Sequence, residues 1–257
     1  MKLTINEFNT SPLVLHGNGN GKSTEVYTGV GHYQFSRNVN KIDKDKYTFI
    51  SWKGGNIAGQ KTILELSGDQ YGFDVINLPW APTDGFWKGS QQKVTETLKA
   101  IKNGLIKTEY VFWLDNTDVF FIDSPDIFFE KYKSVYGNYD FVWNAEKNNY
   151  PTPSHAKWNG SMISERVTNL LLDVIDTDNT YDSSFRYMNS GAGFGKTSKL
   201  LEMLEYAETL IENSRLNDQA LMRIAQKKYK DTVVVDRTCE LFLCCWGLNT
   251  NEVTINL

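Results

Sequence analysis

The chain has 257 residues, of which 40% are hydrophobic and 23% charged, and its formal net charge is −4 at pH 7. This length and composition predict a single α/β domain over residues 1–257 with a substantial core. The acidic balance argues against a protein that grips nucleic acid mainly through a strong basic field, but it leaves room for a local basic groove.

The cysteines and the hydropathy of the chain indicate the cellular compartment in which the protein is expected. The three cysteines, Cys239, Cys244 and Cys245, are odd in number and two are adjacent, unlike a secreted disulfide framework. No apolar run approaches the roughly 20 residues of a membrane span. The N-terminal MKLTINEFNT lacks the apolar region of a signal peptide. We therefore expect a cytoplasmic protein with no membrane span.

Near the N-terminus, a short strand at 13–15 leads through His16 into the glycine-rich run GNGNGKS. The P-loop signature G-x-x-x-x-G-K-[ST] would need its first glycine where His16 stands, so the spacing argues against a P-loop NTPase. The backbone N–H groups of such a loop, together with Lys22, still suit a phosphate. His16 is either a metal ligand or a packed histidine, and taken alone the second interpretation is favoured.

Strands then alternate with helical patterns. Strands are predicted at 47–52, 72–78, 110–114, 139–143, 187–195 and 232–235, and helices at 63–67, 90–106, 125–135, 162–175, 197–212 and 217–229. This alternation favours a mostly parallel or mixed sheet with helices on both faces. Ser90 is the expected N-cap of its helix, and Lys93 opposes the helix dipole there, so it is either solvated or aimed at an anion.

The stretch YVFWLDNTDVFF at 110–121 joins two apolar runs through Asp115 and Asp118. Its first run predicts a strand buried on both faces, and carboxylates at the end of such a strand need a partner. Because ligands of open α/β sheets bind outside the carboxyl ends of strands, one interpretation is a site for Mg²⁺ or Mn²⁺. The other is a hairpin turn with Asp115 and Asn116 as turn residues, and the spacing alone does not decide between them.

The strand YMNSGAGFG at 187–195 has more glycine than ordinary packing needs, so we expect a ligand or another backbone to approach it closely. The polar, proline-containing run at 148–159 is a candidate lid or acceptor-side loop. Asn217, Asp218 and Gln219 open the helix that follows.

Five motifs together resemble a known family: LDNTDVFF, NAE, YMNSGAGFG, NDQ and HGNG. They look like the glycosyltransferase domain of procollagen lysyl hydroxylases and related GT-A glycosyltransferases. In that family HGNG comes last, whereas here it comes first, at His16 to Gly19. The resemblance therefore implies a circular permutation in which residues 2–34 have moved to the front. It implies a single-domain, GT-A-like (Rossmann-like) mixed sheet flanked by helices.

The resemblance also implies a site that holds Mn²⁺ (or Mg²⁺) and a UDP-sugar. By matching positions, the metal ligands are Asp115, Asp118 and His16. The nucleotide-sugar residues are Gly19, Asn20, Gly21 and Lys22 for the diphosphate, Ser51, Trp52 and Lys53 for the uracil and ribose side, Asn116 and Thr117 beside the nucleotide, and Lys93, which matches a helix-opening Q-K pair.

For catalysis the resemblance points to Asp218, which would orient the sugar or the acceptor, with Asn189 and Ser190 lining the sugar site and Glu146 facing the acceptor. Asp218, Glu146 and Trp52 have structural alternatives. Asp218 is equally well explained as an acid at a helix N-terminus. Glu146 is better explained as a solvated loop acid, and Trp52 could be core packing. The family's acidic run before D-Q is here Asn217-Asp218, with one carboxylate missing.

The implied function is metal-dependent transfer of glucose or galactose from a UDP-sugar to an acceptor hydroxyl. The short Asn-, Lys-, Ile- and Tyr-rich chain looks microbial or viral. This suggests that the acceptor is a hydroxymethylated base in viral DNA, which would have to be exposed or flipped out of the helix. A viral enzyme of this kind would work in the host cytoplasm. The alternatives are hydroxylysine, other protein hydroxyls or glycan hydroxyls. A catalytically inactive UDP-binding module is the alternative of another class.

Overall fold

A six-stranded mixed sheet forms the centre of the computed structural model, which describes residues 2–18, 27, 45–54, 59–80, 86–152, 154, 164–211 and 216–256. Its strand order is β4-β3-β5-β8-β7-β9, and β8 runs antiparallel to both of its neighbours. The strands are β3 (Tyr47–Lys53), β4 (Val75–Pro79), β5 (Tyr110–Leu114), β7 (Phe141–Glu146), β8 (Tyr187–Lys196) and β9 (Val233–Val235).

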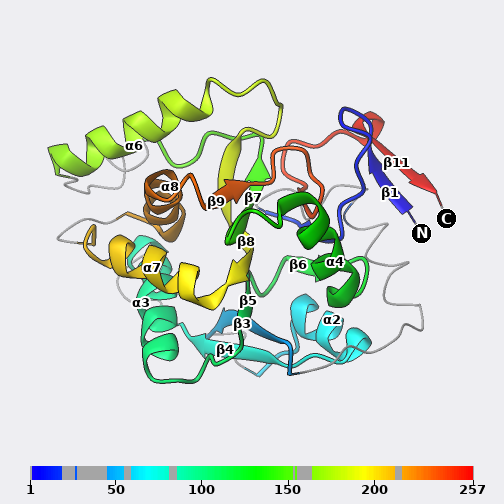
Figure 1. Ribbon diagram of the computed structural model, residues 1–257, viewed down its shortest axis with the longest axis horizontal. Coiled ribbons are helices and arrows are strands. Elements are labelled where there is room, and N and C mark those ends of the chain that lie inside the picture. The colour runs from blue at the N-terminus through cyan, green and yellow to red at the C-terminus, as the bar shows by residue number, and fades with distance from the viewer. Residues whose placement is uncertain are drawn as a thin grey trace.

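Helices cover both faces of this sheet (Figure 1). One face packs against α2 (Ile63–Tyr71) and α4 (Pro125–Tyr136), and the other against α3 (Phe86–Lys102), α7 (Thr197–Glu208) and α8 (Asp218–Lys228). Helix α6 (Glu165–Asp178) contacts α8 from outside. This arrangement confirms the predicted single-domain mixed α/β class. No helix in the described ranges has the length and hydrophobicity to cross a membrane.

Two smaller sheets complete the structure. Strand β2 (Val14–His16) lies between β10 (Phe242–Cys244), which is parallel to it, and β6 (Val119–Phe121), which is antiparallel. Strand β1 (Lys2–Ile5) pairs antiparallel with β11 (Val253–Asn256). Strand β11 directly follows a short 3₁₀ helix at Thr250–Glu252. The two ends of the chain therefore lie side by side (Figure 1).

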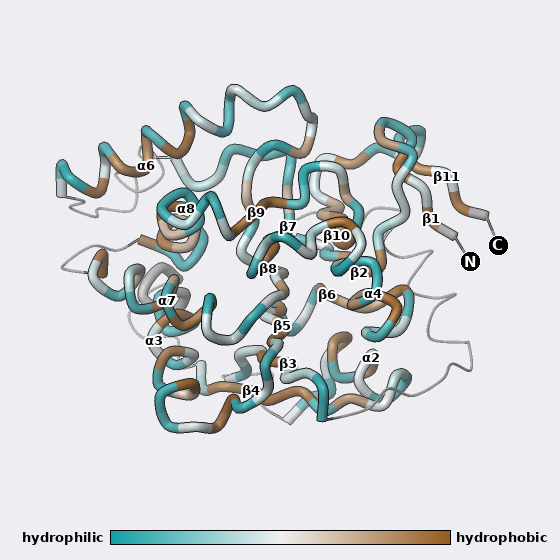
Figure 2. Tube along the Cα trace, viewed as in Figure 1, coloured by the Kyte–Doolittle hydropathy of each residue, from teal (hydrophilic) through white to brown (hydrophobic). Residues whose placement is uncertain are grey.

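Strand β5 is buried on both faces, as its apolar run predicts. Val111 and Trp113 belong to the core against α3, α7 and α8, whereas Phe112 and Leu114 belong to the core against α2 and α4. The hydrophobic stretches in Figure 2 accordingly gather on the central strands and on the inner sides of the helices. Because β5 and β6 pair within different sheets, the hairpin interpretation of the intervening acidic turn is wrong.

Capping chemistry sets several helix ends. Ser124 caps α4 by accepting a hydrogen bond from the Ile127 N–H, and Asn217 caps α8 by accepting one from the Ala220 N–H. The predicted helix at 90–106 is shifted, because α3 begins at Phe86 and ends at Lys102, before Gly104 with its φ of 70°. Ser90 therefore lies inside the helix and does not cap it.

Candidate functional site

Two segments that are distant in sequence, strand β2 and the turn between β5 and β6, meet at the carboxyl end of β5. His16 ends β2, Asp115 follows β5, and Asp118 precedes β6. Backbone hydrogen bonds hold each of them. The Asp115 N–H donates to Gly191 O (2.7 Å), the Gly17 N–H to Asp118 O (2.7 Å), and the Cys245 N–H to His16 O (2.8 Å). The sheets themselves therefore place the imidazole beside the two carboxylates.

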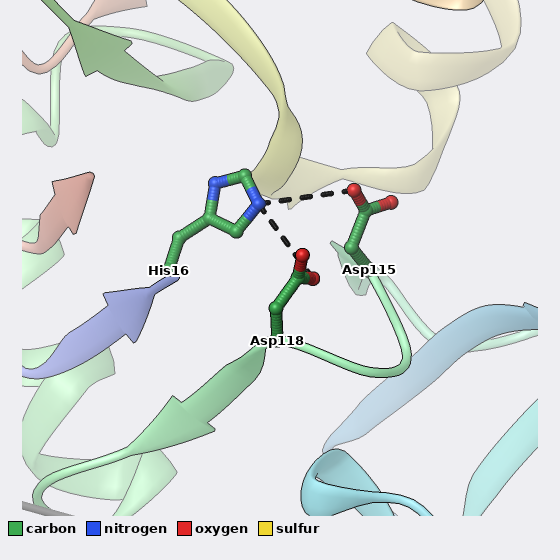
Figure 3. A group of neighbouring side chains, drawn as sticks. All are labelled: His16, Asp115 and Asp118. Carbon is green, nitrogen blue, oxygen red and sulfur yellow. Dashed lines mark ion pairs between the residues drawn. The ribbon is translucent and has the colours of Figure 1, made fainter. Parts of the chain in front are cut away.

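The three side chains point toward one another (Figure 3). His16 Nε2 lies 3.8 Å from Asp115 Oδ2 and 3.7 Å from Asp118 Oδ1. These separations are shorter than twice a metal–ligand distance of about 2.1 Å, so one ion can contact each pair. The His16 side chain is 1% exposed, and its Nε2 has no hydrogen-bond partner within the described segments. An imidazole nitrogen with two carboxylate oxygens suits a divalent cation, so His16, Asp115 and Asp118 fit the metal site expected from the sequence.

The glycine-rich strand β8 is shaped to accept this imidazole. A Cβ on Gly191 would lie 2.0 Å from His16 Cε1 and 2.5 Å from Nε2. The group that approaches Gly191 is therefore a side chain of the same protein, where the sequence suggested a ligand or another backbone. At Gly195 the close neighbours do include backbone, namely Asp140 O at 2.3 Å from such a Cβ.

We expect Gly191→Ala to displace the His16 ring and to weaken Mn²⁺ binding about 10- to 100-fold, the range found when the support of a metal ligand is removed. Overpacking should also cost roughly 1–3 kcal/mol of unfolding free energy. Calorimetric titration with Mn²⁺ measures the first effect. Gly59→Ala is the matched control, because a Cβ there has no heavy atom within 4 Å. An unchanged affinity in Gly191→Ala would contradict this role of the glycine.

Lys93 connects the metal-site carboxylate Asp115 to Asp218. Its Nζ lies 2.6 Å from Asp115 Oδ1 and 3.4 Å from Asp218 Oδ2, and Ser190 Oγ donates to the same Asp218 oxygen at 2.8 Å. Burial by itself lowers the pKa of Lys93, but the charges of Asp115 and Asp218 outweigh it and raise this pKa overall. Burial raises the pKa of Asp115, against the lowering effect of Lys93. The lysine is thus a buried, charged part of the site.

These groups border a cavity of about 230 Å³. Many predicted residues line it: His16, Trp52, Lys93, Asp115, Asn116, Thr117, Asp118, Asn189, Ser190 and Asp218. Three do not. Ser51 is buried within β3, Lys53 pairs with Glu65 (2.8 Å), and Glu146 lies behind the cavity wall. The predicted diphosphate residues Gly19, Asn20, Gly21 and Lys22 lie outside the described residues.

Glu146 is a buried carboxylate, so its interpretation as a solvated loop acid is wrong. It ends β7 and is 1% exposed. Its two oxygens accept hydrogen bonds from Gln219 Nε2 (2.5 Å) and Asn18 Nδ2 (3.4 Å), both of which line the cavity. Burial raises the pKa of Glu146 to about 7, against the lowering effect of bonds from Gln219 and Asn189.

This raised pKa gives a sign to the pH dependence of stability. Between the ordinary 4.5 and about 7, the folded protein binds a proton at Glu146 that the unfolded chain has released. The stabilisation is complete below pH 4.5 and is lost as the pH rises through about 7. In wild type, the free energy of unfolding should therefore decline by up to about 3 kcal/mol from this group as the pH rises from 4.5 to about 7. We expect Glu146→Gln to lack this decline, as measured by urea unfolding at a series of pH values. Glu130→Gln, at an exposed carboxylate, is the control. Equal slopes in wild type and Glu146→Gln would contradict the assignment.

Several cavity residues carried no individual prediction: Asn18, Trp80, Tyr150, Gly191, Asn217 and Gln219. Asn18 stands inside the HGNG motif, and Gln219 follows Asp218 directly, so motif membership was the available signal. Gln219 Nε2 also donates to Tyr150 O (2.6 Å), and Arg223 holds the same carbonyl (3.1 Å). Tyr150 lies in the run at 148–159 that was expected to form a lid or acceptor-side loop, so its place at the cavity agrees with that expectation; residues 153 and 155–159 of the run lie outside the described residues. Trp80 lies in a connection whose sequence shows no periodic pattern.

Comparison with known proteins gives a weak structural likeness. No protein-family model and no curated protein matches the chain. Among solved structures, the fold is similar to that of mouse xyloside xylosyltransferase 1 in its apo form, with a TM-score of 0.39 and 10% identity over 85% of this chain and 79% of that chain. Because this likeness is weak, the function proposed below rests on the residues of the site.

Proposed function

We propose that the protein is a metal-dependent glycosyltransferase that takes its sugar from a UDP-sugar. The observation that carries this proposal is the convergence of His16, Asp115 and Asp118 on a cavity at the carboxyl end of β5. Ligands of α/β sheets bind at such an edge, and hard divalent cations often link carboxylates to substrate phosphates. The motif resemblance to the glycosyltransferase domain of procollagen lysyl hydroxylases supports the choice of donor.

In this proposal His16, Asp115 and Asp118 hold Mn²⁺ (or Mg²⁺). When bound, the ion supplies Lewis-acid stabilisation of the negative charge on the departing diphosphate. The Asn144 amide nitrogen lies 3.3 Å from His16 Nδ1. If His16 were to hold the ion through Nε2, its Nδ1 would carry a proton, and the Asn144 amide would then turn its oxygen toward that N–H. Lys93 adds a fixed positive charge beside the site. Gly19, Asn20, Gly21 and Lys22 are proposed to hold the diphosphate.

The remaining roles divide between nucleotide and sugar. Trp52, Asn116 and Thr117, which line the cavity, are proposed to contact the nucleotide. Ser51 and Lys53 do not line it and are proposed to support the nucleotide side from behind the wall. Asp218, held by Lys93 and Ser190, would orient the sugar or the attacking hydroxyl, next to Asn189. Glu146 is proposed to act on the acceptor side through Gln219 and Asn18, the residues that it contacts.

A circular permutation remains part of the proposal, with residues 1–257 forming one transferase domain. The pairing of Lys2 with Asn256 brings the two ends of the chain together, which makes a permuted order physically tolerable. Strand β2, which carries His16, is bonded to β10 near the C-terminus and to β6 beside Asp118. A family C-terminal strand moved to the front would occupy such a position.

The acceptor is proposed to be a hydroxyl on a hydroxymethylated DNA base, with hydroxylysine or a glycan as the alternatives. The test incubates the protein with Mn²⁺ and UDP-glucose or UDP-galactose, with hydroxymethylcytosine DNA, with a hydroxylysine peptide or with no acceptor. We expect a mass gain of one hexose on one acceptor and slow UDP release without any. Tight UDP binding with neither transfer nor hydrolysis would indicate the inactive binding module. No binding of UDP would contradict the proposed donor.

A further inference from the structure

A chain of hydrogen bonds leads from a carboxylate on α2 to Asn116, which lines the cavity beside the metal site. Glu65 on α2 accepts hydrogen bonds from Lys53 Nζ at 2.9 and 2.8 Å and from the Thr62 N–H at 2.7 Å. Burial raises the pKa of Glu65, but the bonds from Lys53 and Thr62 outweigh it and lower this pKa overall. The carboxylate is therefore ionised near neutral pH, and an ionised carboxylate can only accept hydrogen bonds.

This carboxylate fixes the orientation of two amides in turn. Glu65 Oε1 lies 2.8 Å from Asn77 Nδ2, so the Asn77 amide must present its NH₂ to Glu65 and its oxygen to the other side. Asn77 Oδ1 then accepts from Asn116 Nδ2 at 2.6 Å. The Trp52 carbonyl, 3.5 Å from the same Nδ2, demands the same orientation of Asn116. Two acceptors, Asn77 Oδ1 and the Trp52 carbonyl, therefore determine which atom of the Asn116 amide is the nitrogen and which is the oxygen.

In this arrangement the side-chain oxygen of Asn116 accepts no hydrogen bond from the described residues. The residue is 5% exposed and lines the cavity directly after Asp115, and its Oδ1 has no hydrogen-bond partner within the described residues. A buried acceptor without a partner is costly and calls for an explanation. The cavity offers one, because a ligand there can bring a hydrogen-bond donor.

We propose that Asn116 is a specificity-determining residue whose Oδ1 accepts a hydrogen bond from an N–H or O–H of the nucleoside of the ligand. This inference rests on the proposed use of a uridine nucleotide. Uridine carries such donors at two places, the N3–H of uracil and the ribose hydroxyls. If the donor is N3–H, cytidine is rejected, because its ring presents a lone pair at N3 to the Asn116 oxygen.

Glu65→Gln tests the chain of hydrogen bonds from a distance. Glutamine has one acceptor oxygen, and this oxygen faces the donors of Lys53 and Thr62. The NH₂ of the glutamine therefore faces Asn77. The Asn77 amide then turns over, and its NH₂ competes for the Asn116 oxygen. Glutamine also keeps the capping interaction with Thr62. A replacement outside the cavity should therefore change nucleoside selectivity through Asn116.

The experiment measures Mn²⁺-dependent binding of UDP, N3-methyl-UDP, 2′-deoxy-UDP, 3′-deoxy-UDP and CDP to wild type, Asn116→Leu and Glu65→Gln, after thermal unfolding has shown that each is folded. In wild type, the analogue that lacks the recognised donor should bind about 10-fold more weakly than UDP. N3-methyl-UDP identifies the base as the source, and a deoxy analogue identifies the ribose. This ratio should fall toward one in Asn116→Leu and in Glu65→Gln.

Two results would overturn the inference, and they differ. If wild type binds UDP but no analogue binds more weakly, or if the weakening is as large in both variants as in wild type, Asn116 does not recognise a nucleoside donor. The proposed donor class then still stands. If wild type does not bind UDP with Mn²⁺ at all, the proposed function fails and this inference fails with it.

Discussion

Asp115→Asn and Asp118→Asn are each expected to lower the affinity for Mn²⁺ by at least about 100-fold and to abolish metal-dependent UDP binding. Both carboxylates lie with the His16 Nε2 in one cluster, and an amide oxygen carries no charge to offset that of the ion. Losing a ligand should cost more than the 10- to 100-fold typical of losing its support. Calorimetric titration with Mn²⁺, and with UDP in the presence of Mn²⁺, measures both effects.

The control for the carboxylates is Asp69→Asn, because Asp69 is an exposed acid on α2 paired with Lys61. His16→Ala should match the aspartate variants in metal binding. If UDP bound equally well with EDTA and with Mn²⁺, and if none of these variants changed the affinity, then the assignment of the metal site would be wrong.

Lys93→Met is expected to destabilise the metal-free protein by roughly 3 kcal/mol, because it leaves the partly buried Asp115 and the buried Asp218 without their cation. For a chain of this size the melting temperature should fall by about 6–12 °C. Mn²⁺ should recover more of this loss in the variant than it adds to wild type, since the ion compensates the same carboxylates. Thermal unfolding with EDTA and with Mn²⁺ gives both numbers.

Lys99→Met on the same helix provides the comparison, because Lys99 is 65% exposed and pairs with the neighbouring Glu96. Exposed pairs of this kind contribute about 0–1 kcal/mol. A melting temperature in Lys93→Met no lower than in Lys99→Met would show that the buried lysine does not compensate the acidic groups.

The features predictable from sequence were those fixed by local chemistry. The unbroken apolar run before Asp115 predicts a strand buried on both faces, and β5 is one. Ser124 followed by Pro125 predicts the start of α4, because the cap and the first helical position depend on adjacent residues. The start of α3 was missed, because Ser90 has the chemistry of a cap but lies one turn inside the helix.

The site itself depends on contacts between distant segments. Periodicity around His16 gives no sign that its ring rests on Gly191 or faces Asp118; motif resemblance supplied that link. Glu146 is followed by the polar run KNN, which suggests a loop, and its burial follows from the packing of Gln219 and Asn18 over it. The orientation of the Asn116 amide likewise arises from Asn77 and Trp52, which are 39 and 64 residues away.

Anomalous diffraction from crystals grown with Mn²⁺ and UDP tests the metal site most directly. We predict one manganese peak in the cavity, about 2.0–2.3 Å from His16 Nε2 and from a carboxylate oxygen of both Asp115 and Asp118, in contact with the diphosphate of UDP. UDP bound in the cavity with no manganese at these three side chains, or manganese held by other residues, would contradict the account.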